Sequence, residues 1–169
     1  IVGAISAGTR RVILFFLVAY ALTGLLVYLY SQSHRLSLVA LGVNVALGLP
    51  LVETCVETWG SIDILVNCAG IMDIITFRGT GWDQGWKLLT VNMISPLRLM
   101  DLAVQDMPQG GTIINISSMA GRVPITGCAY YSGAKAGLAM ASEIARNELA
   151  KRNINVVTVY PGPIHSGLE

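Results

Sequence analysis

The sequence predicts an α/β fold in which helices cover both faces of a doubly wound parallel sheet. One observation is composition: of 169 residues, 53% are hydrophobic and 12% are charged, which is more apolar than an average soluble domain. Strands buried on both faces of a parallel sheet are apolar throughout, which accounts for such a composition. The other observation is that short β-branched runs, such as 113–116, alternate with segments of helical periodicity, such as 134–149.

The length of the chain suits a single domain over 1–169 with a sizeable core. The formal net charge of +1 gives no indication of a nucleic-acid partner. The three cysteines, Cys55, Cys68 and Cys128, lack metal-ligand spacing, so no metal site is predicted. Their odd number favours a reduced, cytoplasmic protein.

Residues 1–10 are interpreted as the end of a first strand and a glycine-bearing turn. Glycines in such a turn let the backbone approach a pyrophosphate, which sits at the N-terminus of the following helix. This turn offers only Gly3 and Gly8, so it is a degraded form of a phosphate-binding turn.

Residues 12–30 carry no charge, and two interpretations of this run stay open. Its length is close to the roughly 20 apolar residues that span a bilayer, and the arginine pair before it would supply a positive flank. The favoured interpretation divides the run at Gly24, which would end a buried helix over 9–23 and precede a strand over 25–30.

The rest of the chain alternates predicted strands with predicted helices. The predicted strands are 36–41, 62–67, 113–118 and 154–160. The predicted helices are 50–59, 82–107 and 129–152. Pro50 opens the first of these helices and Gly60 closes it, and a loop is predicted over 71–81. A stripe of large side chains along the second helix is interpreted as core packing. The stripe consists of Trp82, Trp86, Leu89, Met93 and Leu97.

A tyrosine and a lysine stand four residues apart near the start of the predicted helix over 129–152. Tyr131 and Lys135 therefore share one helix face. An ammonium beside a phenol stabilises the phenolate, which makes the phenol a proton donor and acceptor usable near neutral pH. The plain alternative is a half-buried Tyr beside a solvated Lys. Tyr130 is the competing phenol, but it has no Lys four residues later.

Together with other motifs, this pair resembles the short-chain dehydrogenase/reductase family. The resemblance rests on Tyr-x-x-x-Lys, an upstream Ser118, a turn similar to Asn-Asn-Ala-Gly over 67–70, and a Pro-Gly pair at 161–162. It covers 60–169, the catalytic half of the domain. It implies a Rossmann-like fold, truncated at both ends relative to the family. It also implies reversible hydride transfer between a nicotinamide cofactor and an alcohol or carbonyl substrate.

The resemblance also implies roles for individual residues. Tyr131 would protonate the carbonyl oxygen, Lys135 would assist it and bind the nicotinamide ribose, and Ser118 would hydrogen-bond the substrate oxygen. The main chain of Asn92 would hold a relay water, with Pro96 leaving its carbonyl free because proline has no N–H. The predicted cofactor-binding residues are Gly3, Gly8, Arg11, Ser31, Arg35, Asn67, Ala69, Gly70, Tyr131, Lys135, Pro161, Gly162, Ile164 and Ser166.

The residues after the predicted second strand bear on which cofactor is used. In dinucleotide-binding folds, an acidic residue there binds the ribose 2′-hydroxyl of NAD. Residues 31–35 contain no acid, while Ser31, Arg35 and the upstream Arg11 could bind a 2′-phosphate. The sequence therefore predicts NADP in preference to NAD. The alternative is that these arginines are solvated surface charges.

Two other functions stay open. The degraded glycine turn is also compatible with a non-catalytic binding or regulatory module, and the run 12–30 with a membrane-anchored member of the family. A homodimer or tetramer is predicted on the helices that begin at Trp82 and Ala129. The residues of the second helix predicted to allow close approach of another subunit are Ala134, Leu138, Ala141 and Ala145. The segment that would define the small-molecule substrate is expected beyond Glu169.

Overall fold

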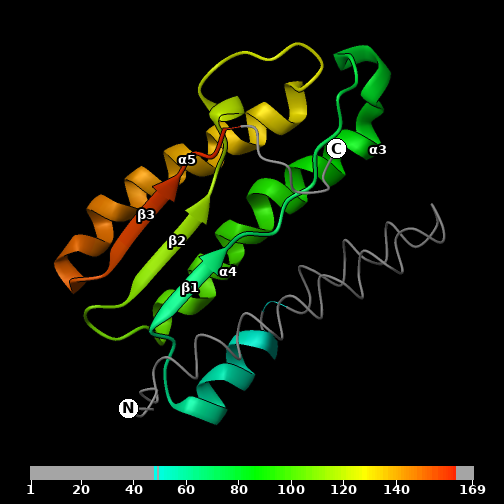
Figure 1. Cartoon of the computed structure of the whole chain (residues 1–169). Helices are drawn as coiled ribbons and strands as arrows, with labels where there is room; N and C mark the ends of the chain where they lie inside the picture. The colour runs from blue at the N-terminus through cyan, green and yellow to red at the C-terminus, as the bar shows by residue number, and fades with distance from the viewer. Residues whose placement is uncertain (1–47, 49, 163–169) are drawn as a thin grey trace, which may run out of the picture.

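The computed structural model describes residues 48 and 50–162 of the chain (Figure 1). A helix over 50–59 comes first. The elements that follow are β1 (Ile64–Asn67), α3 (Phe77–Leu89), the π-helix η1 (Thr90–Ile94), α4 (Ser95–Gln105), β2 (Thr112–Ile116), the 3-10 helix η2 (Met119–Gly121), α5 (Ala129–Leu149), the 3-10 helix η3 (Ala150–Arg152) and β3 (Asn155–Val159). Every element predicted within 1–47, including the glycine turn and the uncharged run, lies outside the described residues. Within the described residues, no helix is long and apolar enough to cross a membrane.

The three strands form one parallel sheet in the order β1-β2-β3. Ile64 pairs with Thr112, which pairs in turn with Asn155. This confirms the predicted α/β fold with a parallel sheet. The strands are shorter than predicted because β1 begins only at Ile64, and because Ser118 leaves the sheet to cap η2.

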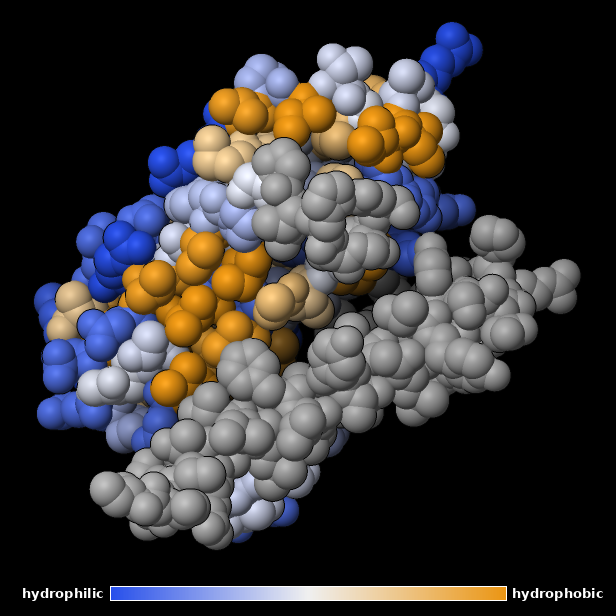
Figure 2. All heavy atoms as spheres, in the orientation of Figure 1, coloured by the Kyte–Doolittle hydropathy of each residue, from blue (hydrophilic) through white to orange (hydrophobic). Residues whose placement is uncertain are grey.

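Side chains alternate between the two faces of this sheet, as the pleat of a strand requires. On one face Leu65, Ile113 and Val156 are 2%, 0% and 3% exposed and pack with side chains of α4 and of the helix over 50–59. Figure 1 shows α4 and α5 on this side, behind the strands. On the other face Ile64 and Val157 are 38% and 43% exposed, and Figure 2 shows apolar side chains gathered over the strands.

The segment predicted as a loop over 71–81 and a helix over 82–107 is built differently. Helix α3 already begins at Phe77 because Thr76 provides an N-cap, its side chain accepting from the Gly79 N–H at 3.3 Å. Gly81, at φ +68°, then interrupts the helical geometry. The π-helix η1 separates α3 from α4, so Pro96 lies in the first turn of α4, where its missing N–H is tolerated.

Of the stripe predicted to be core, Leu97 does pack against the core, but the prediction was wrong for Trp82 and Trp86. These two indoles stack on each other at 6.0 Å and are 66% and 41% exposed. The buried positions of α3 are Gly85 and Leu88. The Tyr130 ring of α5 covers Gly85 and fills the space beside it. A Cβ at position 85 would lie only 2.5 Å from this ring.

Two further expectations about helices need correction. Residue 48 is already helical, so Pro50 does not open the helix over 50–59. Gly60 does end this helix, with φ +84° and an N–H that bonds the Val56 carbonyl. On α5, Ala134 and Leu138 are 0% and 1% exposed within the chain itself. These two positions are therefore not free to receive another subunit.

Candidate active site

The candidate site lies where the three strands end and α5 begins. After β1 come Cys68, Ala69 and Gly70, which leave the backbone accessible. The residues that follow β2 include Ser118, and those that follow β3 include Pro161. In open α/β sheets, ligands bind at the carboxyl ends of the strands, which is the end of the sheet where these residues lie.

Lys135 is buried, with 3% of its surface exposed, instead of solvated. Its Nζ donates to the Ile116 carbonyl at 2.8 Å and lies 5.9 Å from the ring centroid of Tyr131. Burial lowers the pKa of the Lys135 ammonium to about 8, and the neighbouring Cys68 opposes this shift. A buried ionisable group with a perturbed pKa at a strand end is typical of functional sites.

The two adjacent tyrosines have different surroundings. The ring of Tyr130 stacks on Phe77 with a centroid distance of 5.4 Å and an interplanar angle of 9°. It also fills the space above Gly85, so it packs α3 against α5. Tyr131 is the half-buried ring beside the Lys135 ammonium.

Asn92 sits at the centre of η1 and is completely buried. Its Nδ2 donates to the Ile71 carbonyl at 2.8 Å and to the Leu88 carbonyl at 2.9 Å, while its Oδ1 accepts from the Ile71 N–H at 3.3 Å. The side chain thus fastens the segment after β1 onto η1. Sequence reasoning gave Asn92 a main-chain role only and missed this side-chain function.

Gly70 connects Asn92 with Lys135. A Cβ at Gly70 would lie 3.0 Å from Asn92 Oδ1 and 3.5 Å from Lys135 Nζ. The structure therefore brings together three residues that the sequence proposed as site residues, one from each of three separate segments.

Asn67, another predicted cofactor-binding residue, uses its side chain inside the protein. Its Nδ2 donates to Asn115 Oδ1 at 2.7 Å, and Asn115 Nδ2 donates to Ser142 Oγ at 2.8 Å. Ser142 Oγ donates to the Leu138 carbonyl at 2.7 Å. This network joins β1, β2 and α5, and fully satisfied buried networks of this kind rigidify a core. An Asn in the middle of the apolar run of β2 was the available signal for it.

Ser118 is the N-cap of η2, and its Oγ accepts from the Ala120 N–H at 3.1 Å. The next residue, Met119, donates its N–H to the Pro161 carbonyl at 3.0 Å, which ties the end of β2 to the end of β3. The remaining predicted site residues lie outside the described residues or at their edge. Gly162 is exposed, while Gly3, Gly8, Arg11, Ser31, Arg35, Ile164 and Ser166 are not described.

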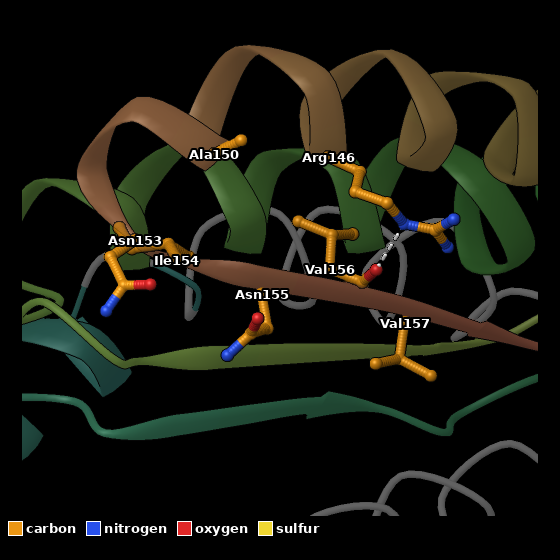
Figure 3. Close-up of a pocket in the computed structure, with 7 residues that line it drawn as sticks. All are labelled: Arg146, Ala150, Asn153, Ile154, Asn155, Val156 and Val157. Atoms are coloured by element: carbon orange, nitrogen blue, oxygen red, sulfur yellow. Dashed lines mark hydrogen bonds between the residues drawn. The ribbon is translucent and has the colours of Figure 1, made fainter.

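A separate hollow of about 400 Å³ lies at the other end of β3 (Figure 3). It is lined by Arg146, Asn153 and Val157 among others, and the Arg146 Nε donates to the Val156 carbonyl at 2.7 Å. This arginine caps a strand carbonyl. Among the described residues it also forms an exposed ion pair with Glu143. Within the described residues, no three His, Cys, Asp or Glu side chains gather as metal ligands.

Comparison with known families gives one clear match. The family model for short chain dehydrogenase matches residues 49–169. Residues 1–48, which include the segment predicted as a glycine-bearing turn, lie outside this range.

Individual relatives agree with the family match. An uncharacterized oxidoreductase of Methylorubrum extorquens is 36% identical over 112 residues, which are 66% of this chain and 45% of that protein. Carbonyl reductase family member 4 of Xenopus tropicalis is 38% identical over 111 residues, which are 64% of this chain and 47% of that protein. The chain thus spans about half the length of the curated relatives it matches.

Solved structures show the same relationship. A dehydrogenase/reductase from Sinorhizobium meliloti 1021 superposes with a TM-score of 0.71 at 29% identity, covering 74% of this chain and 50% of that one. The angucycline C-6 ketoreductase LanV with bound NADP superposes with a TM-score of 0.64 at 31% identity, covering 68% and 46%.

Proposed function

Because the chain belongs to the short-chain dehydrogenase/reductase family, we propose that it serves NAD(P)-dependent interconversion of a small alcohol and its carbonyl compound. The observation that carries this proposal is the buried Lys135 ammonium beside Tyr131 at the carboxyl ends of the strands. Carbonyl reductase activity, named for a relative that is 38% identical, is the direction we favour.

In this proposal, Tyr131 donates a proton to the carbonyl oxygen during reduction. The Lys135 ammonium stabilises the phenolate that remains, since an opposite charge nearby favours the ionised form. An ammonium has three N–H donors, and within the described residues only the Ile116 carbonyl accepts one of them. Donors therefore remain for Tyr131 and for a ligand.

Ser118 is suited to orient the substrate. Its Oγ accepts a bond from the Ala120 N–H, and within the described part of the chain it donates none. The hydroxyl hydrogen is therefore available for the substrate oxygen. Asn92 is proposed to hold a relay water through its main-chain carbonyl, which Pro96 cannot bond because it has no N–H.

The strand ends fit a nicotinamide cofactor. Cys68 and Ala69 are exposed and Gly70 has no side chain, so the backbone after β1 is open to a ligand on one side. The cofactor supplies the hydride when bound, and the protein supplies position and the proton. The described residues proposed to hold it are Asn67, Ala69, Gly70, Tyr131, Lys135, Pro161 and Gly162. Gly3, Gly8, Ile164 and Ser166 are proposed from the sequence.

NADPH is expected to be used in preference to NADH. The residues predicted to bind the 2′-phosphate are Arg11, Ser31 and Arg35. A hydrogen bond from an arginine to this phosphate is charge-assisted and contributes roughly 1.5–3 kcal/mol, which corresponds to about tenfold or more in kcat/KM. The measurement is kcat/KM for both cofactors with a panel of aldehydes and ketones, repeated on Arg11→Ala and Arg35→Ala. Equal efficiencies, or an NADH preference that neither substitution changes, would contradict the preference. A chain that neither binds nor oxidises NADPH or NADH would instead support a non-catalytic module.

A homo-oligomer is part of the same proposal. Its interface is proposed on a different surface from Ala134 and Leu138, which are buried within the chain. Exposed apolar side chains on α3 and α5 fit a second copy of this chain: Trp82 and Trp86 at 66% and 41%, and Met140 and Ile144 at 64% and 51%. Light scattering at micromolar concentration is expected to give a dimer or tetramer, and Met140→Glu to weaken it by placing a charge in an apolar contact. A monomeric wild type would count against this surface.

We also propose a cytoplasmic location, since Cys55, Cys68 and Cys128 are all free thiols.

A further inference from the structure

We infer that Ser117, acting with Gly121, is a positioning residue that fixes Ser118 relative to Lys135. This inference rests on the proposed function for its catalytic consequence. Ser117 touches neither substrate nor cofactor in the proposal, and its effect runs through the two residues that do.

The first anchor is a pair of opposed hydrogen bonds between the end of β2 and Lys135. Ser117 is 3% exposed, and its Oγ donates to the Lys135 main-chain carbonyl at 2.8 Å. In the other direction, Lys135 Nζ donates to the Ile116 carbonyl at 2.8 Å. The backbone and the side chain of Lys135 are thus both tied to the two residues that precede Ser118.

The second anchor is the contact of Gly121 with α5. A Cβ at Gly121 would lie 2.9 Å from Ala136 N, 2.9 Å from Lys135 C and 3.2 Å from Lys135 Cβ. The first two of these atoms are helix backbone, which cannot move aside as the tip of a flexible side chain could. Only a residue without a side chain lets η2 rest directly on α5 at Lys135.

Ser118 lies between these two anchors. Its carbonyl accepts from the Gly121 N–H at 3.0 Å and its Oγ accepts from the Ala120 N–H at 3.1 Å, so the turn from 118 to 121 is internally closed. Both ends of this turn therefore meet the same residue of α5. The arrangement fixes Ser118 against Lys135 from both sides, although the two residues come from different elements.

Loss of one anchor should misplace reacting groups more than it unfolds the chain. A displacement of about 1 Å in a catalytic group can reduce the rate about 10²-fold. Ser117→Ala is expected to lower kcat by about tenfold to 10²-fold with a smaller change in KM. Ser117→Thr, which keeps a hydroxyl, should recover most of the rate.

Ser142→Ala is the matched control. Ser142 is a completely buried serine on the same helix, and its Oγ also donates to a helix carbonyl, that of Leu138, at 2.7 Å. Its Oγ also accepts from Asn115 Nδ2 of β2 at 2.8 Å, but among the described residues it makes no hydrogen bond to Ile116, Ser117 or Ser118. Its loss should lower the melting temperature about as much as Ser117→Ala does, while kcat of the folded enzyme stays near that of the wild type.

A second readout does not depend on turnover. In ¹³C-lysine NMR, the Lys135 side chain of the wild type should titrate near pKa about 8. In Ser117→Ala and Gly121→Ala the midpoint should move toward the ordinary lysine value of roughly 10.4, because a released side chain is better solvated. Ser142→Ala should leave it unchanged.

Two results would overturn the inference. One is a Lys135 titration midpoint in Ser117→Ala equal to that of the wild type, and the other is a kcat loss in Ser117→Ala no greater than that of Ser142→Ala. An inactive wild type would refute the proposed function while the NMR titration still decides the positioning.

Discussion

Tyr131→Phe is expected to lower kcat by about 10²- to 10⁴-fold, the usual contribution of a general acid or base. The substitution deletes one hydroxyl and keeps the half-buried ring that lies 5.9 Å from Lys135 Nζ. The melting temperature and the affinity for the cofactor should therefore stay close to those of the wild type. Steady-state rates, cofactor titration by fluorescence and thermal unfolding together separate loss of chemistry from loss of fold.

Tyr130→Phe is the control for this experiment. The Tyr130 ring stacks on Phe77 and covers Gly85, and phenylalanine keeps both contacts. Its kcat should stay within a few-fold of the wild type. A Tyr131→Phe enzyme that keeps most of its rate, or a Tyr130→Phe enzyme that loses it, would show that the proton donor has been assigned to the wrong residue.

The sequence allowed the parallel sheet and α5 to be predicted because their signals are local. The β-branched run of β2 is followed by two serines, and helical periodicity continues for many residues after Tyr131. Both patterns report burial directly, since the period of a strand or helix determines which side chains face the core. The pairing of Tyr131 with Lys135 followed from that periodicity alone.

Features that depend on contacts between elements could not be predicted in the same way. The exposure of Trp82 depends on the Tyr130 ring, which occupies the buried side of α3 at Gly85. The burial of Lys135 depends on contacts with the end of β2, where the Ile116 carbonyl accepts from its ammonium although the two residues lie far apart in sequence. Periodicity records which residues share a face, but it cannot show what covers that face.

The polar network of Asn67, Asn115 and Ser142 illustrates a related limit. Each residue alone resembles a turn or surface residue that happens to sit in an apolar segment. Their function is visible only when the sheet places Asn67 beside Asn115, which it does through the register of β1 and β2. The same placement brings Gly70 against Asn92 and Lys135, which is how residues scattered along the chain form one candidate site.

Removing the Lys135 ammonium should have the second large effect. Lys135→Met keeps an apolar stem of similar shape and is expected to lower kcat about 10²-fold or more, the usual loss when one preorganised charge or donor is removed. In the wild type, burial holds the pKa of Lys135 near about 8. A rate that depends on the ammonium should therefore fall as pH rises through about 8, and this decline should be absent from the residual activity of Lys135→Met.

Stability should change with pH in the opposite direction. The folded-state pKa of Lys135 lies below the ordinary value of 10.5, so between about 8 and 10.5 the unfolded chain binds more protons at this residue than the folded chain does. The contribution of Lys135 to the free energy of unfolding therefore rises with pH across that window. Lys135→Met should be more stable than the wild type at pH 7, and its advantage should shrink as pH approaches 10.5. Paired denaturant unfolding of both proteins cancels the titration of all shared groups and isolates this difference.

A variant that is less stable at pH 7, together with an unchanged rate, would mean that Lys135 serves the fold and not the chemistry. A more stable but inactive variant would instead show that a buried charge is kept at the cost of stability because the reaction needs it.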